Sequence, residues 1–308
     1  MKFTNANFPL GDDGRTYHVG TKLGETANKI LTVGDPARAK LIAQTHFDKD
    51  VPIKEVSSKR GFVTLTGAYK GVPVSIVAIG MGISMMDFFV REVRAVTEGP
   101  LDIIRFGSCG SISTDAKVGS LAVATDGSVC ATRNYDHFTG SKKDAKSEPY
   151  HISQVVEANS ELSNLLRDKI ADAVGKKNVA TGLNVTADSF YSSQARLDPR
   201  FADENQTLIE TIHKRYPNAI TLEMESYMLL HLAACSGKRE DGSVDPALKI
   251  RAAACTMIFA DRVGGAFISG PEATEKLEAS GGKACLEALI GVKSSASPQK
   301  RKRGKDDE

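Results

Sequence analysis

Short apolar, β-branched runs alternate along the chain with segments in which apolar residues recur every three or four positions. The apolar runs predict strands, and the longer periodicity predicts amphipathic helices. The predicted strands cover residues 29–33, 62–69, 72–79, 101–106, 121–125, 181–186, 219–222 and 252–259. The predicted helices cover residues 37–46, 84–97, 155–174, 225–235 and 271–289. This alternation predicts an α/β fold in which helices flank a mixed central sheet.

A single large domain over residues 1–292 is predicted, followed by a short basic tail. The chain has 308 residues, of which 41% are hydrophobic and 25% charged, an ordinary composition for a globular protein. Residues 293–308 have almost nothing apolar to bury, so we expect a disordered tail. The basic run at residues 300–303 is interpreted as a solubilising tail, with a nuclear import signal as the alternative. The polar, lysine-rich residues 139–148 predict a mobile loop.

Charge, apolar runs and cysteine usage restrict the location and the partners. The net charge of +2 is too small to favour nucleic-acid binding by the domain. Residues 1–18 lack the apolar core of a secretory signal, and the longest apolar stretch, residues 72–86, is too short to span a membrane. The five cysteines lack metal-site spacing, and an odd, scattered set suits a reducing compartment. These features predict a cytoplasmic protein without a bound metal, with nuclear entry through the tail left open.

The most informative segment is residues 29–38, Lys-Ile-Leu-Thr-Val-Gly-Asp-Pro-Ala-Arg. Its strand stops at Gly34, where no side chain keeps a ligand away, and Asp35 and Pro36 suit the start of a helix. Free N–H groups at a helix start attract anions, and Arg38 adds a charge that can hydrogen-bond phosphate through two nitrogens. The segment therefore predicts an anion site.

Other predicted strand ends carry glycine turns and one further arginine. Residues 79–82 join a strand to a helix through two glycines, and residues 105–110 place Arg105 at a strand end beside a glycine turn and a hydroxyl. A structural salt bridge is the more frequent role of a single buried arginine, because an unpaired buried charge is costly. Ligands gather at the strand ends of α/β sheets, so Arg38 and Arg105 together favour a shared anion.

Two later segments carry weaker signals for a flat ring and a sugar. In residues 187–196, Phe190 can stack on a ring while polar neighbours bond its edge, although a core aromatic is the more frequent role. Residues 223–226, Glu-Met-Glu-Ser, offer carboxylates for vicinal hydroxyls and a thioether for the apolar face of a sugar. A helix-start residue matched to the helix dipole is an equally good interpretation of Glu225.

Taken in this order and at this spacing, the motifs resemble the nucleoside phosphorylase family and, within it, the uridine phosphorylases. The resemblance covers residues 15–291, and trypanosomatid members are the most similar over residues 34–38, 78–93 and 105–110. It implies one three-layer α/β/α domain around a mixed sheet that closes partly into a barrel. It also implies that phosphate displaces uracil from C1′ of uridine to give ribose 1-phosphate, with phosphate as co-substrate and no cofactor.

The resemblance assigns roles to single positions. The residues that match the family's phosphate site are Gly34, Arg38, Arg60, Arg105 and Ser108. Those that match its ribose site are His18, Glu223, Met224 and Glu225. Those that match its base site are Gly110, Phe190, Gln194, Arg196 and Arg262, and the implied catalytic groups are Arg105, Gln194 and Arg196. In the family, the counterparts of His18 and Arg60 come from a neighbouring subunit, which implies a homodimer as the smallest active unit.

Several positions depart from the family's pattern. Ser108 stands where threonine is frequent, which preserves the hydroxyl, and Cys109 is interpreted as a small packing residue. Gly61 replaces the glutamate that binds an interface potassium ion in bacterial relatives, so no metal site is implied. Asp261 matches the aspartate that protonates the base in purine-cleaving relatives, and an ion pair between Asp261 and Arg262 is a simpler interpretation.

Three alternative functions stay open on the sequence alone. A purine nucleoside phosphorylase would use Asp261, although the pair Gln194 and Arg196 has the spacing of pyrimidine enzymes and is harder to obtain by chance. A nucleosidase, which uses water, has no need for three phosphate arginines. A non-enzymatic nucleoside-binding or nucleic-acid-associated protein would depend on the basic tail, and an enzyme would keep its activity without residues 293–308.

Overall fold

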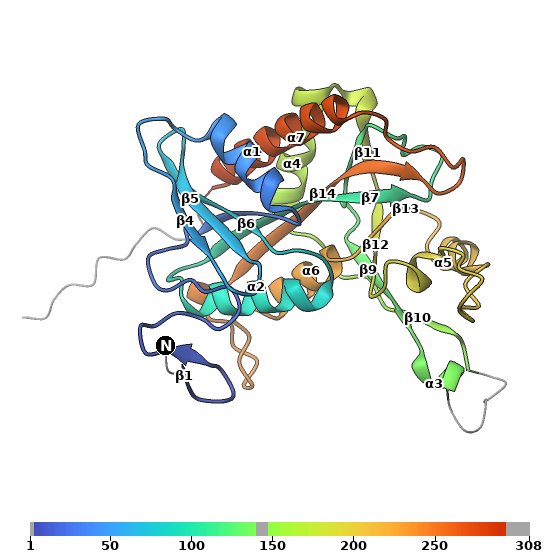
Figure 1. Cartoon of the computed structure of the whole chain (residues 1–308), viewed down its shortest axis with the longest axis horizontal. Coiled ribbons are helices and arrows are strands. Elements are labelled where there is room, and N and C mark those ends of the chain that lie inside the picture. The colour runs from blue at the N-terminus through green and yellow to red at the C-terminus, as the bar shows by residue number, and fades with distance from the viewer. Residues whose placement is uncertain (1–2, 140–146, 294–308) are drawn as a thin grey trace, which may run out of the picture.

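The computed structural model describes residues 3–139 and 147–293 (Figure 1). Its helices are α1 Pro36–His46, α2 Ile83–Ala95, α3 Tyr135–Thr139, α4 Ser160–Val174, α5 Leu208–Arg215, α6 Ser226–Cys235 and α7 Pro271–Gly291. Its strands are β1 Phe3–Thr4, β2 Leu10–Gly11, β3 Lys29–Val33, β4 Lys54–Ser57, β5 Val63–Tyr69, β6 Val72–Ala78, β7 Leu101–Ser111, β8 Leu121–Val123, β9 Ser128–Arg133, β10 Tyr150–Ile152, β11 Val179–Thr181, β12 Leu183–Ala187, β13 Ala219–Glu223 and β14 Ile250–Asp261. The predicted tail, apart from its first residue Lys293, and most of the predicted mobile loop lie outside the described residues.

Helices cover both faces of the central sheet, which confirms the predicted three-layer α/β fold. Figure 1 shows α1, α4 and α7 together on one side of the sheet and α2 with α6 on the other. A separate apolar cluster fills each interface. Among the described helices, none has the length and apolar character needed to cross a membrane.

Strand β7 is the centre of the sheet. β14 runs parallel to β7 along the whole length of β7. On the opposite edge of β7, β3 runs parallel to its first half, as far as Arg105. β13 pairs with the same edge in the opposite direction, from Gly110 onward. β3 and β13 therefore end facing one another along β7, and no described strand pairs with residues 106–109 on that edge.

The predicted barrel character is present in part, and the sheet does not close in the described chain. Starting from β7, neighbouring strands lead through β14, β8 and β11, and β12 and β13 lead back to β7. β11 and β12 are consecutive segments joined by Gly182. The ring of strands is therefore continuous through the main chain at this point, and no hydrogen bonds pair the described strands β11 and β12. A Cβ at Gly182 would lie 2.8 Å from the oxygen of Asn218, which explains the glycine at this junction.

Two adjacent glycines let helix α7 approach its neighbours closely. A Cβ at Gly281 would lie 2.5 Å from the Phe106 ring of β7, and one at Gly282 would lie 2.6 Å from Ile42 of α1. Glycine costs helix stability in an interior position. The close packing of α7 on the sheet and on α1 explains why it stands at both sites.

The strand predicted to end at Gly107 continues to Ser111, so the expected glycine turn is wrong. The glycines of this segment make space for arginine side chains within a regular strand. A Cβ at Gly107 would lie 3.4 Å from Nε of Arg105, and one at Gly110 would lie 2.9 Å from Cγ of Arg262.

The helix predicted from residue 155 begins at Ser160, and several elements are not predicted. Val156 pairs with Ser128 as an extended bridge, and the Asn159 side chain caps α4 by accepting from the amide of Leu162. β9, β10 and α5 were not predicted from the pattern. Their positions depend on pairing between segments distant in sequence, which local periodicity does not report.

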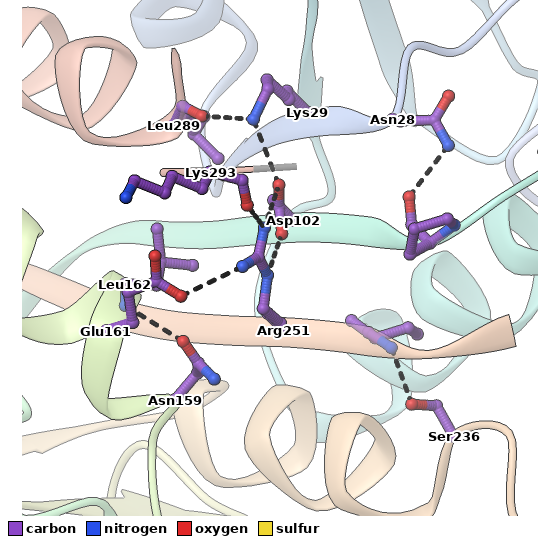
Figure 2. A network of polar contacts seen from close by, with 12 residues as sticks. Asn28, Lys29, Asp102, Asn159, Glu161, Leu162, Ser236, Arg251, Leu289 and Lys293 are labelled. Atoms are coloured by element: carbon purple, nitrogen blue, oxygen red, sulfur yellow. Dashed lines mark hydrogen bonds and ion pairs between the residues drawn. The ribbon is translucent and has the colours of Figure 1, made fainter. Parts of the chain in front are cut away.

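A charged network joins three central strands to two helices (Figure 2). Asp102 accepts two hydrogen bonds from Arg251, at 2.7 and 3.0 Å, and a third from Nζ of Lys29 at 3.1 Å. Lys29 also donates to the main-chain oxygen of Leu289 at the end of α7, and Arg251 contacts Glu161 of α4. Asp102 is buried, so both cations depend on its carboxylate.

We expect Asp102→Ala to lower the free energy of unfolding by about 3–5 kcal/mol, because it leaves two largely buried cations without their shared partner. Guanidinium chloride unfolding measures the loss. The control is Asp168→Ala, which removes a 61% exposed carboxylate from a surface pair and should cost less than about 1 kcal/mol. Equal losses in the two variants would contradict the structural role of the network.

Candidate active site

A cavity of about 390 Å³ opens where β3 and β13 end along the unpaired edge of β7. Its lining residues are Gly34, Asp35, Arg38, Gly80, Met81, Arg105, Ser108, Cys109, Gly110, Phe190, Gln194, Arg196, Leu222, Glu223, Met224, Glu225, Phe259, Ala260 and Phe267. The volume is in the range of small-molecule sites. The structure therefore brings together the predicted site residues except His18, Arg60 and Arg262.

Arginines and the turn after β3 form one end of the cavity. Asp35 caps α1 by accepting from the amide of Ala37 at 2.8 Å, so this helix N–H is already paired. Arg38 is held by Glu278 of α7, which accepts from its Nε at 2.8 Å. A Cβ at Gly34 would lie 3.2 Å from the main-chain oxygen of Gly80 and 3.6 Å from Nη2 of Arg105, so the turn after β3 packs closely on residue 80. The cationic end depends mainly on the two arginines.

Arg105 is only partly paired although it is 3% exposed. Its Nη2 donates to Glu225 at 2.8 Å, while its Nε and Nη1 have no hydrogen-bond partner among the described residues. The other carboxylate oxygen of Glu225 accepts from the amide of Gly82 at 2.6 Å, at the start of α2. Buried donors without partners are costly, so a ligand that accepts from Arg105 would be strongly bound.

Glu223 holds the turn that carries Met224 and Glu225. Its Oε2 accepts from the amides of Glu225 and Ser226, both at 2.9 Å, and its Oε1 accepts from Nδ2 of Asn184 at 2.8 Å. Burial and the neighbouring Glu225 carboxylate raise the pKa of Glu223. Glu223 is saturated by protein donors, and Glu225 is the carboxylate better placed to accept from a ligand.

The opposite end of the cavity is cationic and aromatic. The guanidinium of Arg196 lies 4.0 Å above the ring of Phe190, which is 44% exposed. Arg262 lies beside Gly110 and donates to the main-chain oxygen of Ala195 at 3.1 Å. Nε of Arg196 and Nη1 of Arg262 have no partner in the described chain. Burial lowers the pKa of both guanidinium groups, and the charge of Arg196 contributes to the lowering at Arg262.

Asp261 does not pair with Arg262, so that interpretation is wrong. Its Oδ1 accepts from the amides of Val263 and Gly264, at 2.8 and 2.9 Å, in the turn that follows β14. These two hydrogen bonds lower the pKa of Asp261. The carboxylate therefore stays ionised more readily, which makes it a poorer proton donor to a leaving base. Asp261 is not among the residues that line the cavity.

His18 and Arg60 lie outside the cavity of their own chain. Nδ1 of His18 contacts Glu92 at 2.6 Å, and the imidazole stacks on Phe88 at 3.8 Å. Nη2 of Arg60 donates to the hydroxyl of Tyr17 at 2.8 Å. Both side chains are therefore held on a surface apart from the site.

Some lining residues were not predicted. Leu222, Phe259 and Phe267 add apolar surface, and Phe267 follows two glycines after β14, a strand-end signal like those found elsewhere in the chain. Asn184 does not line the cavity but donates to Glu223, and it is not predicted because a polar residue inside a strand gives no sign of its partner. Cys109 also lines the cavity, and burial raises the pKa of its thiol, which agrees with its interpretation as a packing residue.

A family model for the phosphorylase superfamily matches residues 29–264 of the chain. The chain belongs to the phosphorylase superfamily. It is 32% identical over 225 residues to a DeoD-type purine nucleoside phosphorylase of Geobacillus kaustophilus, across 73% of this chain and 82% of that protein. It is 31% identical over 227 residues to the corresponding protein of Anoxybacillus flavithermus, with the same coverage. The family resemblance inferred from the motifs is thus confirmed.

Solved structures of this superfamily share the fold. A structure from a study of uridine phosphorylases of the oomycete Phytophthora capsici has a TM-score of 0.85 and 38% identity, covering 95% of this chain and all of the other. A Trypanosoma brucei nucleoside phosphorylase described as showing uridine phosphorylase activity has a TM-score of 0.73 at 22% identity, covering 92% of this chain and 100% of that one. This second similarity supports the fold alone.

We expect Glu223→Ala to lower the free energy of unfolding by about 3 kcal/mol or more, because it leaves the buried amides of Glu225 and Ser226 without an acceptor and removes one acceptor from Nδ2 of Asn184. Chemical denaturation measures the loss. Glu240→Ala, at an exposed loop position, is the control and should change stability by less than about 0.5 kcal/mol. A Glu223→Ala variant as stable as this control would indicate that Glu223 serves only a ligand.

Proposed function

We propose that this member of the phosphorylase superfamily is a uridine phosphorylase, which converts uridine and phosphate reversibly to uracil and ribose 1-phosphate in pyrimidine salvage. The observation that carries the proposal is the base end of the cavity. Arg196 and the buried Gln194 line it, Arg262 adjoins it, and each arginine has a guanidinium nitrogen without a partner among the described residues. Uracil presents two carbonyl oxygens, and these donors match such an edge.

The remainder of the cavity suits phosphate and ribose. Arg38 and Arg105 would hold phosphate, which serves as co-substrate, and the Ser108 hydroxyl would add a donor. Glu225 would accept from ribose hydroxyls while Met224 covers the sugar. Holding phosphate beside C1′ converts an encounter between two molecules into a step within one complex, which lowers the entropic part of the barrier.

The charge pattern suits a transition state with a cationic ribose and a departing anionic base. Glu225 and Glu223 supply negative charge next to the ribose. Arg196 and Gln194 would stabilise the charge that develops on the uracil oxygens, so no strong acid is required. The reaction needs no cofactor beyond phosphate.

A purine nucleoside phosphorylase is the second candidate, because the curated relatives from Geobacillus kaustophilus and Anoxybacillus flavithermus carry that name. Such an enzyme would need an acid near the base nitrogen. One oxygen of the Asp261 carboxylate accepts from two main-chain amides, and the residue does not line the cavity, which favours the uridine proposal. Release of base from uridine and from inosine, with and without phosphate, tests both. Phosphate-dependent uracil release supports our proposal, and its absence contradicts it.

We also propose that two subunits share each site, with Arg60 and His18 completing the site of a neighbour. The proposal is supported by their lying outside the cavity of their own chain. A homodimer with twofold symmetry would contain two such sites.

We expect Arg196→Ala to lower kcat for uridine by about 10²–10³-fold, because it removes a donor that stabilises the leaving base. Steady-state phosphorolysis measures the change, and circular dichroism verifies the fold. Arg200→Ala is the matched control from the same loop, since the Arg200 side chain is 81% exposed, and its rate should stay near that of the wild type. Normal turnover in Arg196→Ala would contradict the assigned base contact.

Two inactive variants should restore activity when they are combined. If Arg60 serves a neighbour, an equal mixture of Arg60→Ala and Arg196→Ala chains, unfolded and refolded together, should recover about a quarter of the wild-type rate, because a quarter of the sites escape both changes. Separately refolded variants provide the baseline. A mixture no more active than its parents would show that Arg60 acts within its own subunit.

In contrast, Asp261→Asn should retain uridine phosphorolysis within about threefold, since a carboxylate that does not line the cavity is not required to protonate uracil. Assay of uridine and inosine with the same preparation separates the two candidates. Loss of base release in this variant would favour the purine mechanism.

A further inference from the structure

In the loop that carries Gln194 and Arg196, the residue between them has a left-handed backbone conformation. A short 3₁₀ helix, Ser192–Gln194, ends at Ala195, which has φ 54° and ψ 34°. Residues with a Cβ rarely adopt this left-handed conformation. Both neighbours of Ala195 line the cavity, so the backbone at this position determines where their side chains lie.

The buried side chain of Asn205 is hydrogen-bonded to the main chain of this loop. It is 1% exposed, and its Nδ2 donates to the main-chain oxygen of Ser192 at 2.9 Å and to that of Arg196 at 3.0 Å. One side-chain amide thus joins both ends of the loop. The main-chain oxygen of Asn205 accepts from the amide of Leu208 at 3.2 Å, which anchors the asparagine to the start of α5.

Backbone strain is concentrated around this contact. Ala195 lies inside the loop, and Glu204, with φ 46°, immediately precedes Asn205. The other non-glycine residues with positive φ in the described chain are Asn5 and Lys70. Strained residues persist where the surrounding contacts outweigh the strain, and they gather at functional sites. The two amide hydrogen bonds provide such contacts.

Asn205 does not line the cavity, and the other parts of the site are held independently of it. Arg105 belongs to β7 and is paired with Glu225, which in turn is held by Gly82 at the start of α2. Arg38 belongs to α1 and is paired with Glu278. A change at Asn205 therefore acts on the base end without a direct effect on the ribose and phosphate ends.

We propose that Asn205 is a positioning residue for base discrimination: its amide holds Gln194 and Arg196 in the arrangement that distinguishes one base edge from another. The inference rests on the proposed function of the cavity as a nucleoside site. Aspartate would fill the same space without the two donors, and alanine would remove both donors and the bulk, so loss of the amide frees the loop at both ends.

The test compares Asn205→Ala with a matched asparagine control, Asn178→Ala. Nδ2 of Asn178 donates to the main-chain oxygen of Val174 at the end of α4, so this variant removes the same chemical contact outside the site. Two readouts are measured on both variants and the wild type. The first is kcat/KM for uridine and cytidine, which share ribose and differ at the base edge, together with KM for phosphate. The second is hydrogen exchange in a peptide covering residues 190–200.

In Asn205→Ala we expect kcat/KM for uridine to fall about 10-fold or more, because a small misplacement of binding groups is costly. The preference for uridine over cytidine should narrow about fivefold, and KM for phosphate should stay within about twofold. Exchange in residues 190–200 should become about 10-fold faster. Asn178→Ala should resemble the wild type in every readout.

A folded Asn205→Ala variant that keeps the wild-type base preference and the wild-type exchange overturns the inference, as does a uniform loss that raises KM for phosphate in parallel. Asn205→Ser, which retains one donor, replaces Asn205→Ala where the latter does not fold, and the same criteria apply. Failure of the proposed function has a different signature, because the wild type would not release uracil with phosphate. The exchange comparison then still decides whether Asn205 holds the loop.

Discussion

Arg105 is buried at the centre of the sheet, with one guanidinium nitrogen bonded to Glu225 and two that have no partner in the described part of the chain. Much of the site is arranged around this side chain. Gly107 gives the side chain its space within β7, and Gly34 lies close to its guanidinium. The ion pair joins β7 to the turn after β13. A buried cation that is only partly satisfied favours an anion in the cavity, and the carboxylate partner offsets part of the cost of burying the charge.

The cavity alternates in charge from one end to the other. Arg38 and Arg105 make one end cationic, Glu223 and Glu225 make the middle anionic, and Arg196 with Arg262 makes the far end cationic again. Each group is fixed by a different element, so the pattern is set before any ligand arrives. Fixed charges of this kind need little reorganisation during reaction, which is how preorganised sites stabilise charge that develops late.

Individual residues show where the sequence was informative and where it was not. The strand, cap and helix at residues 29–46 agree with the structure, because Asp35 and Pro36 determine the helix start locally. The turn predicted at Gly107 and Gly110 is wrong, since Gly107 lies beside the Arg105 side chain of its own strand and Gly110 lies beside Arg262, which follows β14. Asn184 and Asn205 went unnoticed because their hydrogen bonds reach residues that local patterns do not connect.

The sequence by itself determined the α/β layer order, the family and most of the residues that line the cavity, because apolar periodicity and motif order are properties of neighbouring positions. Only the tertiary structure decided that β3 and β13 end facing one another along β7, that Glu223 is saturated while Glu225 faces Arg105, and that Asp261 is bound within a turn. These outcomes depend on which strands pair and which buried donors meet an acceptor. Such pairing is a long-range property. Burial makes it decisive because a buried polar group without a partner costs free energy.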